Sequence, residues 1–398
     1  MSDTQKNKKP NVPNLRFPRF EGEWEESTFG DCSTGFDYGM NAASKPFDGE
    51  HKYIRITDID ENTSEYKEDG VVSPDSEIDE HYRVNENDIL FARTGASTGK
   101  TYLYSPKDGR LYFAGFLIRM NVSSLNNARF VFYLTQTSRY KKWVQIMSMR
   151  SGQPGINSQE YSSYRCFLPK LEEQQKIADL LTLVDRRISV QNKVIEDLKK
   201  LKAALGEKSI KQVHGVQIRL GDILDERNEK STLNNQYEVL SSTVTGIYSQ
   251  REYFNKDIAS TNNSGYKIIR RGDIVFSPQN LWMGNINYND RFENGIVSPS
   301  YKVFSIRKDF DAKYIAFLLK TKKALWTYSL VSEQGASIVR RNLNLESFLE
   351  ISFPIPSYIK QKEIGDMISA VNSKLLLEQK LLNSLSRQKS YLLNSMFI

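Results

Sequence analysis

The chain repeats one sequence pattern at a spacing of about 187 residues. Residues 82–91 (YRVNENDILF) are echoed by residues 266–276 (YKIIRRGDIVF), and each has a polar turn before an Asp and a short apolar run. Residues 167–177 correspond in the same way to residues 353–364. This spacing is too long for a solenoid and suits whole domains. We therefore expect two tandem domains, each followed by the same appendage.

The appendage has the spacing of a long helix. Apolar residues recur in alternating steps of four and three, an a/d heptad pattern with no Pro inside it, which predicts a coiled coil. An amphipathic helix lying on its own domain is the alternative. However, roughly 38 residues at 1.5 Å rise extend about 57 Å, which exceeds the width of a small domain. The predicted packing positions are Ile177, Leu181, Val184, Ile188, Ile195 and Leu198 in the first copy and Ile364, Ile368, Val371, Leu375, Leu382 and Leu385 in the second.

The two helical segments also share their polar interruptions. Gln191 and Lys202 occupy seam positions in the first copy, and Glu378 and Lys389 follow them at the same spacing of about 187 residues. Polar residues at such positions fix the register or the partner of a coiled coil at some cost in stability.

The segments before the helices have mixed α/β character. Short β-like runs at 53–57, 88–91 and 301–306 are separated by Gly, Asn, Asp and Pro turn signals, and more helical stretches follow at 128–144 and 312–329. We predict a mixed α/β fold with two tandem domains and two long helices that form an antiparallel coiled coil. The expected boundaries are an N-terminal tail at 1–20, a first domain at 21–171, a central helix at 172–210, a second domain at 211–357 and a C-terminal helix at 358–398.

Charge is unevenly divided between the two copies. The whole chain has a net charge of +7, but residues 1–210 hold 30 basic and 30 acidic side chains, so residues 211–398 hold the entire excess. A basic half indicates nucleic-acid binding or simply a basic protein.

Composition excludes several classes. No run approaches eighteen apolar residues, so a membrane span is not expected, and the polar, lysine-rich start is not a secretory signal. Two cysteines are too few for a disulfide framework or a cysteine zinc site. We therefore expect a cytoplasmic location.

One segment imitates a phosphate-binding loop. Residues 93–101 (RTGASTGKT) follow a strand-like run, but three residues separate the glycines where a P-loop has four. The second copy, 277–284 (SPQNLWMG), lacks the lysine. Three histidines lack metal-ligand spacing, and neither a nucleophile elbow nor the Asn-Pro-Pro-aromatic motif of an amino-methyltransferase occurs. We expect no catalytic residue, metal site or cofactor in this chain.

Polar loops recur at matching places in both copies, and their residue types suit nucleic acid. Arg matches guanine edges, Asn and Gln match adenine edges, and Lys, Ser and Thr suit phosphates. For any single residue, a solvated loop side chain is the alternative, so recurrence in both copies is the stronger signal. The candidate DNA-binding residues are Arg93, Thr94, Ser97, Lys100, Arg150 and Gln153 in the first copy and Gln279, Asn280, Trp282, Arg340, Arg341 and Asn342 in the second.

Three stretches closely resemble the DNA-specificity (S) subunit of Type I restriction–modification systems. They are residues 13–26 (PNLRFPRFEGEWEE), 87–95 (NDILFARTG) and 169–178 (PKLEEQQKIA), the last leading into the long helix. The resemblance implies two target-recognition domains, each binding one half of a bipartite, asymmetric DNA site. It also implies that the two helices pack antiparallel and dock two modification subunits.

The same resemblance places the chemistry in partner subunits. The modification subunits would bind S-adenosylmethionine and methylate adenine, and restriction subunits would use ATP and Mg²⁺. The second copy lacks the Arg-Thr-Gly of residues 93–95, so equal base-reading roles are not expected there.

Two other functions compete with this interpretation. The first is an enzyme, either an NTPase or a fused restriction–methyltransferase, and methyl transfer by the purified chain alone would exclude the specificity subunit. A coiled-coil scaffold without a DNA role would show no salt-dependent gel shift.

Overall fold

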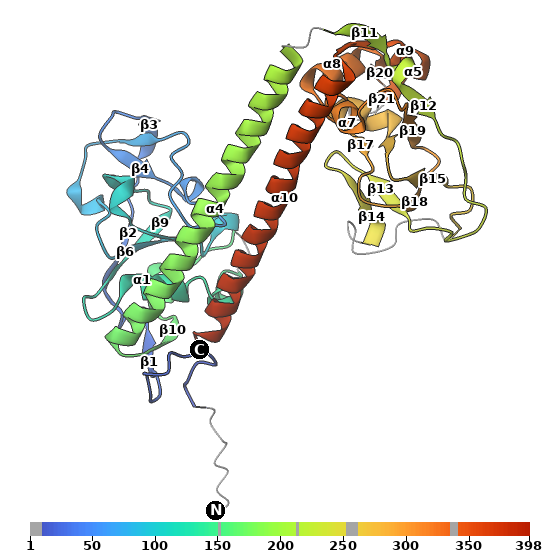
Figure 1. Ribbon diagram of the computed structural model, residues 1–398. Helices are drawn as coiled ribbons and strands as arrows, with labels where there is room; N and C mark the ends of the chain where they lie inside the picture. Colours follow the sequence, from blue (N-terminus) through green and yellow to red (C-terminus); the bar gives the residue numbers. More distant parts are fainter. Residues whose placement is uncertain (1–9, 150–152, 212–214, 252–261, 335–340) are drawn as a thin grey trace, which may run out of the picture. The chain divides into compact units, whose positions relative to one another are not determined.

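The computed structural model describes residues 10–149, 153–211, 215–251, 262–334 and 341–398. The chain divides into two compact units (Figure 1). Unit 1 contains Met1–Asn192 and Leu381–Ile398, and unit 2 contains Lys193–Lys380. Each unit therefore holds one end of each long helix, α4 (Leu171–Lys211) and α10 (Tyr358–Ser395).

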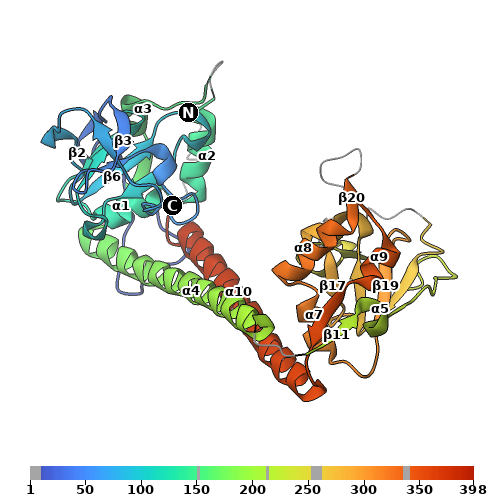
Figure 2. The same ribbon diagram turned by 90° about the horizontal axis from the view of Figure 1, so that it is seen from above.

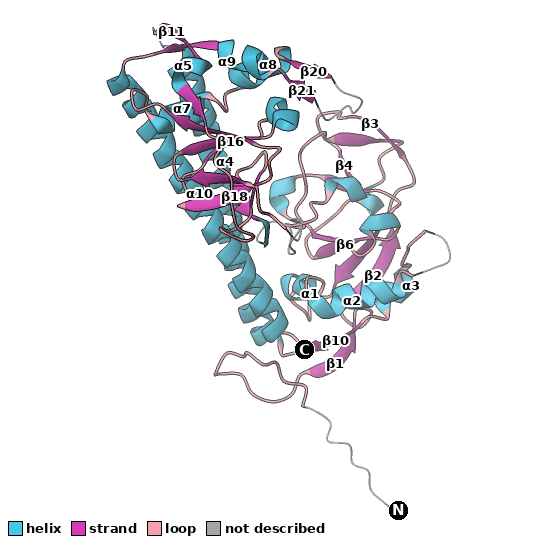
Figure 3. Ribbon diagram, turned by 90° about the vertical axis from the view of Figure 1, so that its right-hand side faces the viewer, coloured by secondary structure: helices cyan, strands magenta, loops and turns pink. Residues whose placement is uncertain are grey.

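Unit 1 is built around a four-stranded antiparallel sheet in the order β2-β9-β6-β7. Helices α1, α2 and α3 lie to one side of this sheet (Figure 3). In its described residues the unit also has three strand pairs and four 3₁₀ turns. The sheet strands are β2 (Ser33–Tyr38), β9 (Leu117–Val122), β6 (Asp88–Ala92) and β7 (Thr101–Leu103), and the helices are α1 (Ala128–Leu134), α2 (Ser138–Met147) and α3 (Ser158–Ser162). The pairs are β1 (Glu25–Thr28) with β10 (Arg165–Leu168), β3 (Ala43–Pro46) with β5 (Val72–Asp75) and β4 (Lys52–Ile54) with β8 (Leu111–Phe113); the turns are η1 (Ile56–Asp58), η2 (Glu80–Tyr82), η3 (Gly95–Ser97) and η4 (Pro106–Asp108).

Unit 2 repeats this plan with the sheet order β12-β19-β16-β17. Helices α7 and α8 lie beside β17 (Figure 2). The sheet strands are β12 (Leu224–Glu226), β19 (Lys302–Ile306), β16 (Asp273–Phe276) and β17 (Ile286–Tyr288), and the short helices are α5 (Leu220–Ile223), α7 (Ala312–Leu318), α8 (Lys322–Leu330) and α9 (Leu345–Glu350), with η5 (Pro278–Met283). The pairs are β11 (Val216–Arg219) with β22 (Ser352–Ile355), β13 (Leu240–Ser242) with β14 (Ile247–Ser249), β15 (Lys267–Arg270) with β18 (Asn294–Val297) and β20 (Ser332–Gln334) with β21 (Arg341–Leu343).

Aromatic side chains fill the main core of each unit. In unit 1, Phe29 packs against Phe91 and Tyr164 with ring centroids 5.9 and 4.7 Å apart. In unit 2, Phe276 and Phe304 stack at 5.6 Å. The ends of the long helices join these cores, since Ile177 and Leu181 lie in the first and Ile364 and Ile368 in the second. The domain and its helix ends are therefore one packed body within each unit.

The long helices run antiparallel where they meet in unit 1. Lys389, in the last two turns of α10, forms an ion pair of 2.7 Å with Asp185, in the first half of α4. The predicted mixed α/β fold with two long helices is confirmed. None of the helices in the described residues combines the length and apolarity needed to cross a bilayer.

One local prediction was wrong in detail, and another is confirmed with a finer division. The strand expected at 53–57 ends at Ile54, because the turn η1 (Ile56–Asp58) begins after Arg55, whose backbone N–H and guanidinium donate to the Asp58 carboxylate. The helical stretches at 128–144 and 312–329 are each two helices, separated at Thr137 and Thr321. Each threonine caps the second helix of its pair, which stops the first from continuing.

Candidate nucleic-acid interface

The two candidate loops leave the same place in the two sheets. The first follows β6, whose five residues are all buried between β9 and β7. The second follows β16, which is buried between β19 and β17. A rigid central strand therefore positions each loop, as is common for binding loops.

Two glycines shape the first loop. Gly95 and Gly99 have φ angles of 74° and 87°, which L side chains rarely adopt. At Gly99 a Cβ atom would also come within 2.5 Å of Val144 Cγ1 in α2. The loop leads into strand β7 and not into a helix, so it lacks the helix N-terminus of a P-loop.

The first loop is paired with the segment before α3. Gly95 N–H donates to Pro154 O at 2.9 Å, and Ile156 N–H donates to Arg93 O at 2.9 Å. The side chain of Gln153 lies over Gly95, 3.2 Å from the position of a Cβ. Of the predicted residues, the structure thus brings Arg93, Thr94, Ser97 and Gln153 together.

Arg93 has an aromatic support that the sequence did not reveal. Its guanidinium carbon lies 4.8 Å from the ring centroid of Tyr38 in β2, and Nη1 donates to Gly115 O at 3.4 Å. Ser158 N–H donates to the Tyr38 hydroxyl at 3.2 Å. Hydrogen bonds from Ser158 lower the pKa of the Tyr38 phenol, and Arg93 adds to this effect. Tyr38 lies 55 positions before Arg93, so local spacing gave no signal.

Lys100 is already neutralised within unit 1. Its Nζ lies 2.5 Å from Glu61 Oε1, which lies in the turn after η1. This contact lowers the pKa of the Glu61 carboxyl. Lys100 can therefore meet a phosphate only in competition with Glu61.

The second loop is the 3₁₀ turn η5, which ends at Gly284 with φ 96°. Gln279 is exposed and Trp282 half-buried. Asn280 Oδ1 is buried without a hydrogen-bond partner among the described residues. This loop offers amides and an indole where the first offers an arginine.

The second loop is paired with β21. The Arg341 guanidinium lies 4.7 Å from the Trp282 ring centroid, and Nη1 donates to Ser329 O at 3.1 Å. The adjacent Asn342 is exposed. The predicted residues of the second copy therefore also come together, with a stacked arginine in both units.

Two predicted DNA-binding residues, Arg150 and Arg340, lie outside the described residues. The predicted helix-packing positions are all buried or half-buried. The buried ones are Ile177, Leu181, Val184, Ile195, Ile364, Ile368 and Leu385, and the half-buried ones are Ile188, Leu198, Val371, Leu375 and Leu382.

Among the described residues, catalytic groups do not gather at the loops. No group of three or more His, Cys, Asp or Glu residues in the described ranges could hold a metal ion. Both cysteines, Cys32 and Cys166, are buried free thiols in the core of unit 1.

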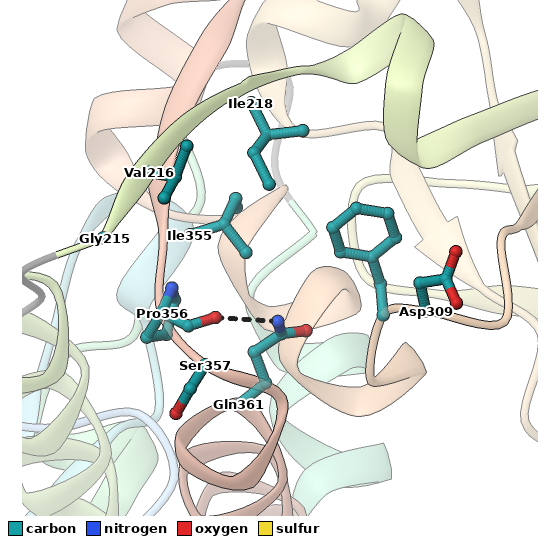
Figure 4. A pocket seen from close by; sticks show the side chains of 9 residues that line it. Gly215, Val216, Ile218, Asp309, Ile355, Pro356, Ser357 and Gln361 are labelled. Atoms are coloured by element: carbon teal, nitrogen blue, oxygen red, sulfur yellow. Dashed lines mark hydrogen bonds between the residues drawn. The ribbon is translucent and has the colours of Figure 1, made fainter.

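Unit 2 also has an open pocket of about 770 Å³ at the junction of β11, β22 and the first turns of α10 (Figure 4). Gln361 lies in it and donates to Pro356 O at 2.9 Å. The rest of its lining is Gly215, Val216, Ile218, Asp309, Phe310, Ile355 and Ser357. This mostly apolar set lacks the paired acid–base or nucleophilic groups of a catalytic site.

Comparison with known proteins identifies the repeated domain. The family model of the Type I restriction modification DNA specificity domain matches residues 22–200 and again residues 215–387. The putative type I restriction enzyme MjaX specificity subunit of Methanocaldococcus jannaschii is 22% identical over 97% of this chain and 96% of its own length. The MjaVIII specificity subunit of the same organism is 30% identical over 37% of this chain and 33% of its own length.

Solved structures show the same fold. The Type-I restriction-modification system S subunit from M. genitalium matches 97% of this chain and 99% of its own, with a TM-score of 0.64 and 15% identity. A structure from work on complex assembly and conformational transition of the type I R-M system matches 93% of this chain and 96% of its own, with a TM-score of 0.50 and 14% identity.

Proposed function

Because the chain belongs to the Type I restriction modification DNA specificity family, we propose that it selects the DNA site at which a restriction–modification complex acts. Its role is sequence-specific DNA binding. As a specificity subunit it is the non-catalytic member of that complex. Each recognition domain reads one half of a bipartite, asymmetric site.

The repeated loop pair carries this proposal. Both units place a loop after the buried central strand and support it with a second segment, yet the side chains differ. The first pair presents Arg93 and Gln153, and the second presents Gln279, Trp282 and Asn342. One scaffold with two sets of side chains suits a site whose halves differ in sequence.

Arginine stacking supports the assignment of the loops as the DNA-reading surface. A guanidinium held against an aromatic ring loses little freedom when it meets a planar base edge. Arg93 on Tyr38 and Arg341 on Trp282 are both held in this way. In this proposal the arginines and amides meet base edges, whereas Thr94, Ser97 and Lys100 meet phosphates.

The long helices are the proposed docking surface for two modification subunits. Apolar side chains are exposed along one face of α4, at steps of seven, four and seven residues, which place them on one stripe. An exposed apolar stripe of this kind marks a protein interface. The stripe consists of Leu183, Val190, Val194 and Leu201.

The remaining chemistry belongs to partners in this proposal. Modification subunits bind S-adenosylmethionine and methylate adenine, and restriction subunits use ATP and Mg²⁺. The recognition domains span residues 21–171 and 211–357, with helices at 172–210 and 358–398 as spacers. Action on cellular DNA places the complex in the cytoplasm.

DNA binding by the assembled complex tests the proposal. The chain with its modification subunits should shift duplex DNA in a gel, and the affinity should fall steeply with salt because phosphate contacts release counterions. The purified chain alone should transfer no methyl group. Methyl transfer by the chain alone, or a complex without salt-dependent DNA binding, would contradict the proposed role.

A further inference from the structure

An N-terminal segment, residues 10–24, contacts the first turn of α4 in unit 1. Nε and Nη2 of Arg16 donate to the two carboxylate oxygens of Glu173, each at 2.8 Å. Arg19 forms a second ion pair, of 3.0 Å, with Glu172. Because Glu173 is buried, its bidentate pair with Arg16 is a strong contact. Two positive charges thus hold the segment against the start of this helix.

The segment ends in a buried aromatic side chain, Trp24, directly before β1. The Trp24 ring lies 5.8 Å from the ring of Phe130 in α1 and 6.4 Å from that of Phe397, just beyond the end of α10, measured between centroids. All three side chains belong to the core of unit 1. A buried indole contributes a large share of the contact energy of such a segment, so unit 1 covers this helix start with its own chain.

The strand pairs show which positions of unit 2 are equivalent. Strand β1 pairs with β10 in the same register in which β11 pairs with β22, so that Glu25 matches Val216 and Trp24 matches Gly215. A Cβ atom on Gly215 would lie 2.3 Å from Ile355 O, which is closer than a side chain can approach. Unit 2 therefore carries no side chain at the position that matches the buried tryptophan.

The charges at the start of the helix also differ in unit 2. At the spacing of 187 residues, Glu172 is replaced by Ile359 and Glu173 by Lys360. Lys360 forms an ion pair of 2.8 Å with Glu363 on the same helix, and both side chains are exposed. An arginine placed as in unit 1 would meet a lysine here, and like charges repel. The N-terminal segment of this chain, including that of a second copy, therefore does not suit the start of α10.

Exposed apolar side chains surround the start of α10 instead. Val216, Tyr358 and Ile359, here called the apolar patch, are 72%, 51% and 74% exposed. Val216 also lines the pocket of about 770 Å³, where Ile218 and Ile355 lie side by side (Figure 4). Apolar side chains gathered beside a pocket mark a protein interface. They offer no charge to a phosphate backbone, so this surface suits a protein and not DNA.

We propose that the apolar patch and its pocket bind a segment of a modification subunit that carries an aromatic side chain and a carboxylate. The aromatic side chain enters the pocket, and the carboxylate meets Lys360, which is the arrangement of Trp24 and Arg16 in unit 1 with the charges exchanged. The patch includes the first turn of α10, one of the two helices on which the modification subunits are proposed to dock. The inference rests on that proposed function and makes the two docking sites unequal, because unit 1 covers its own helix start.

Exchange of residues between the units tests the patch. Ile359→Glu and Val216→Glu give unit 2 the residues that unit 1 has at the matching positions. Both positions are exposed, so the thermal unfolding of the full chain should not change. The affinity of each full-chain variant for purified modification subunits is measured by titration. We expect each substitution to weaken this association by about tenfold or more, because it places a carboxylate in an apolar contact.

Unit 1 supplies a matched control. Glu172→Ile gives it the residue of unit 2, and association should equal that of the wild type because the N-terminal segment covers this position. Lys360→Glu should weaken association, whereas Lys360→Arg keeps the charge and should not. A synthetic peptide with the sequence of residues 10–24 should not compete with the modification subunits.

Three results would overturn the docking site. One is unchanged association in both Ile359→Glu and Val216→Glu. Another is competition by the peptide of residues 10–24, which would make the chain's own segment the occupant. The third is self-association of the wild-type chain that Ile359→Glu abolishes, which would make a second copy the occupant. In each case weaker association of Leu183→Ala leaves the proposed docking on the helices intact, whereas a wild type that does not associate with modification subunits overturns both.

Discussion

At the scale of single residues, one glutamine ties each long helix to its domain. Gln174 Oε1 accepts from the N–H of Asn127 at 2.9 Å, and Gln361 Oε1 accepts from the N–H of Asp311 at 3.0 Å. Asn127 and Asp311 are the N-caps of α1 and α7. Each glutamine also donates to the carbonyl of a proline five residues before it. Both glutamines are buried, so neither bond can be replaced by water without rearrangement.

Replacement of this glutamine should destabilise its unit. Gln361→Ala leaves the N–H of Asp311 and a proline carbonyl without partners, and a buried unsatisfied group costs about 1–3 kcal/mol. Denaturant unfolding of the full chain measures the loss. Lys362→Ala, at the exposed neighbouring position, is the control and should change the free energy of unfolding by less than about 0.5 kcal/mol. Equal effects of the two substitutions would show that the hydrogen bonds of Gln361 do not stabilise the unit.

Lys320 should make the stability of unit 2 depend on pH. Its pKa is lowered to about 8 in the folded chain, whereas an unfolded lysine titrates near 10.4. Between these values the unfolded state binds more protons, so the contribution of Lys320 to stability rises with pH. The Lys320 amine donates to Asn287 Oδ1 and Val244 O, which are neutral, and burial is the main cause of the lowered pKa, with a smaller contribution from the charge of Lys202. The free energy of unfolding of the wild type should therefore rise relative to that of Lys320→Met between pH 8 and pH 10. Denaturant unfolding of both proteins over this pH range measures it. Parallel curves of unfolding free energy against pH would show that the Lys320 amine is not buried.

At the scale of elements, α4 presents two different apolar faces. One face, with Ile177 and Leu181, is buried in the core of unit 1. The other carries Leu183 and Val190, which are exposed. A helix that is apolar on two sides has one face for its own fold and one available to a partner.

The two faces should separate stability from assembly. Leu181→Ala removes a fully buried side chain and should cost about 2–5 kcal/mol of unfolding free energy. Leu183→Ala should leave unfolding within about 0.5 kcal/mol of the wild type and instead weaken the association with the modification subunits. Urea unfolding and sedimentation of the reconstituted complex measure the two effects. If Leu183→Ala lost stability without losing assembly, the docking surface would lie elsewhere on the chain.

At the scale of the whole molecule, the duplication and the heptads were visible in the sequence because they depend on spacing along the chain. The recurrence of polar loops also pointed to residues that the fold brings together, such as Arg93 with Gln153. Tyr38 under Arg93 and Glu61 beside Lys100 were not predictable, since tertiary packing alone brings them together.

The central claim is that each unit reads its own half of the DNA site. Mapping of methylated adenines across the genome tests this claim. It compares cells that express the wild type with cells that express a chain whose η5 loop and β21 are replaced by those of another specificity subunit. The exchange should alter one half of the methylated sequence and preserve the other half. A change in both halves, or in neither, would contradict the two-reader account.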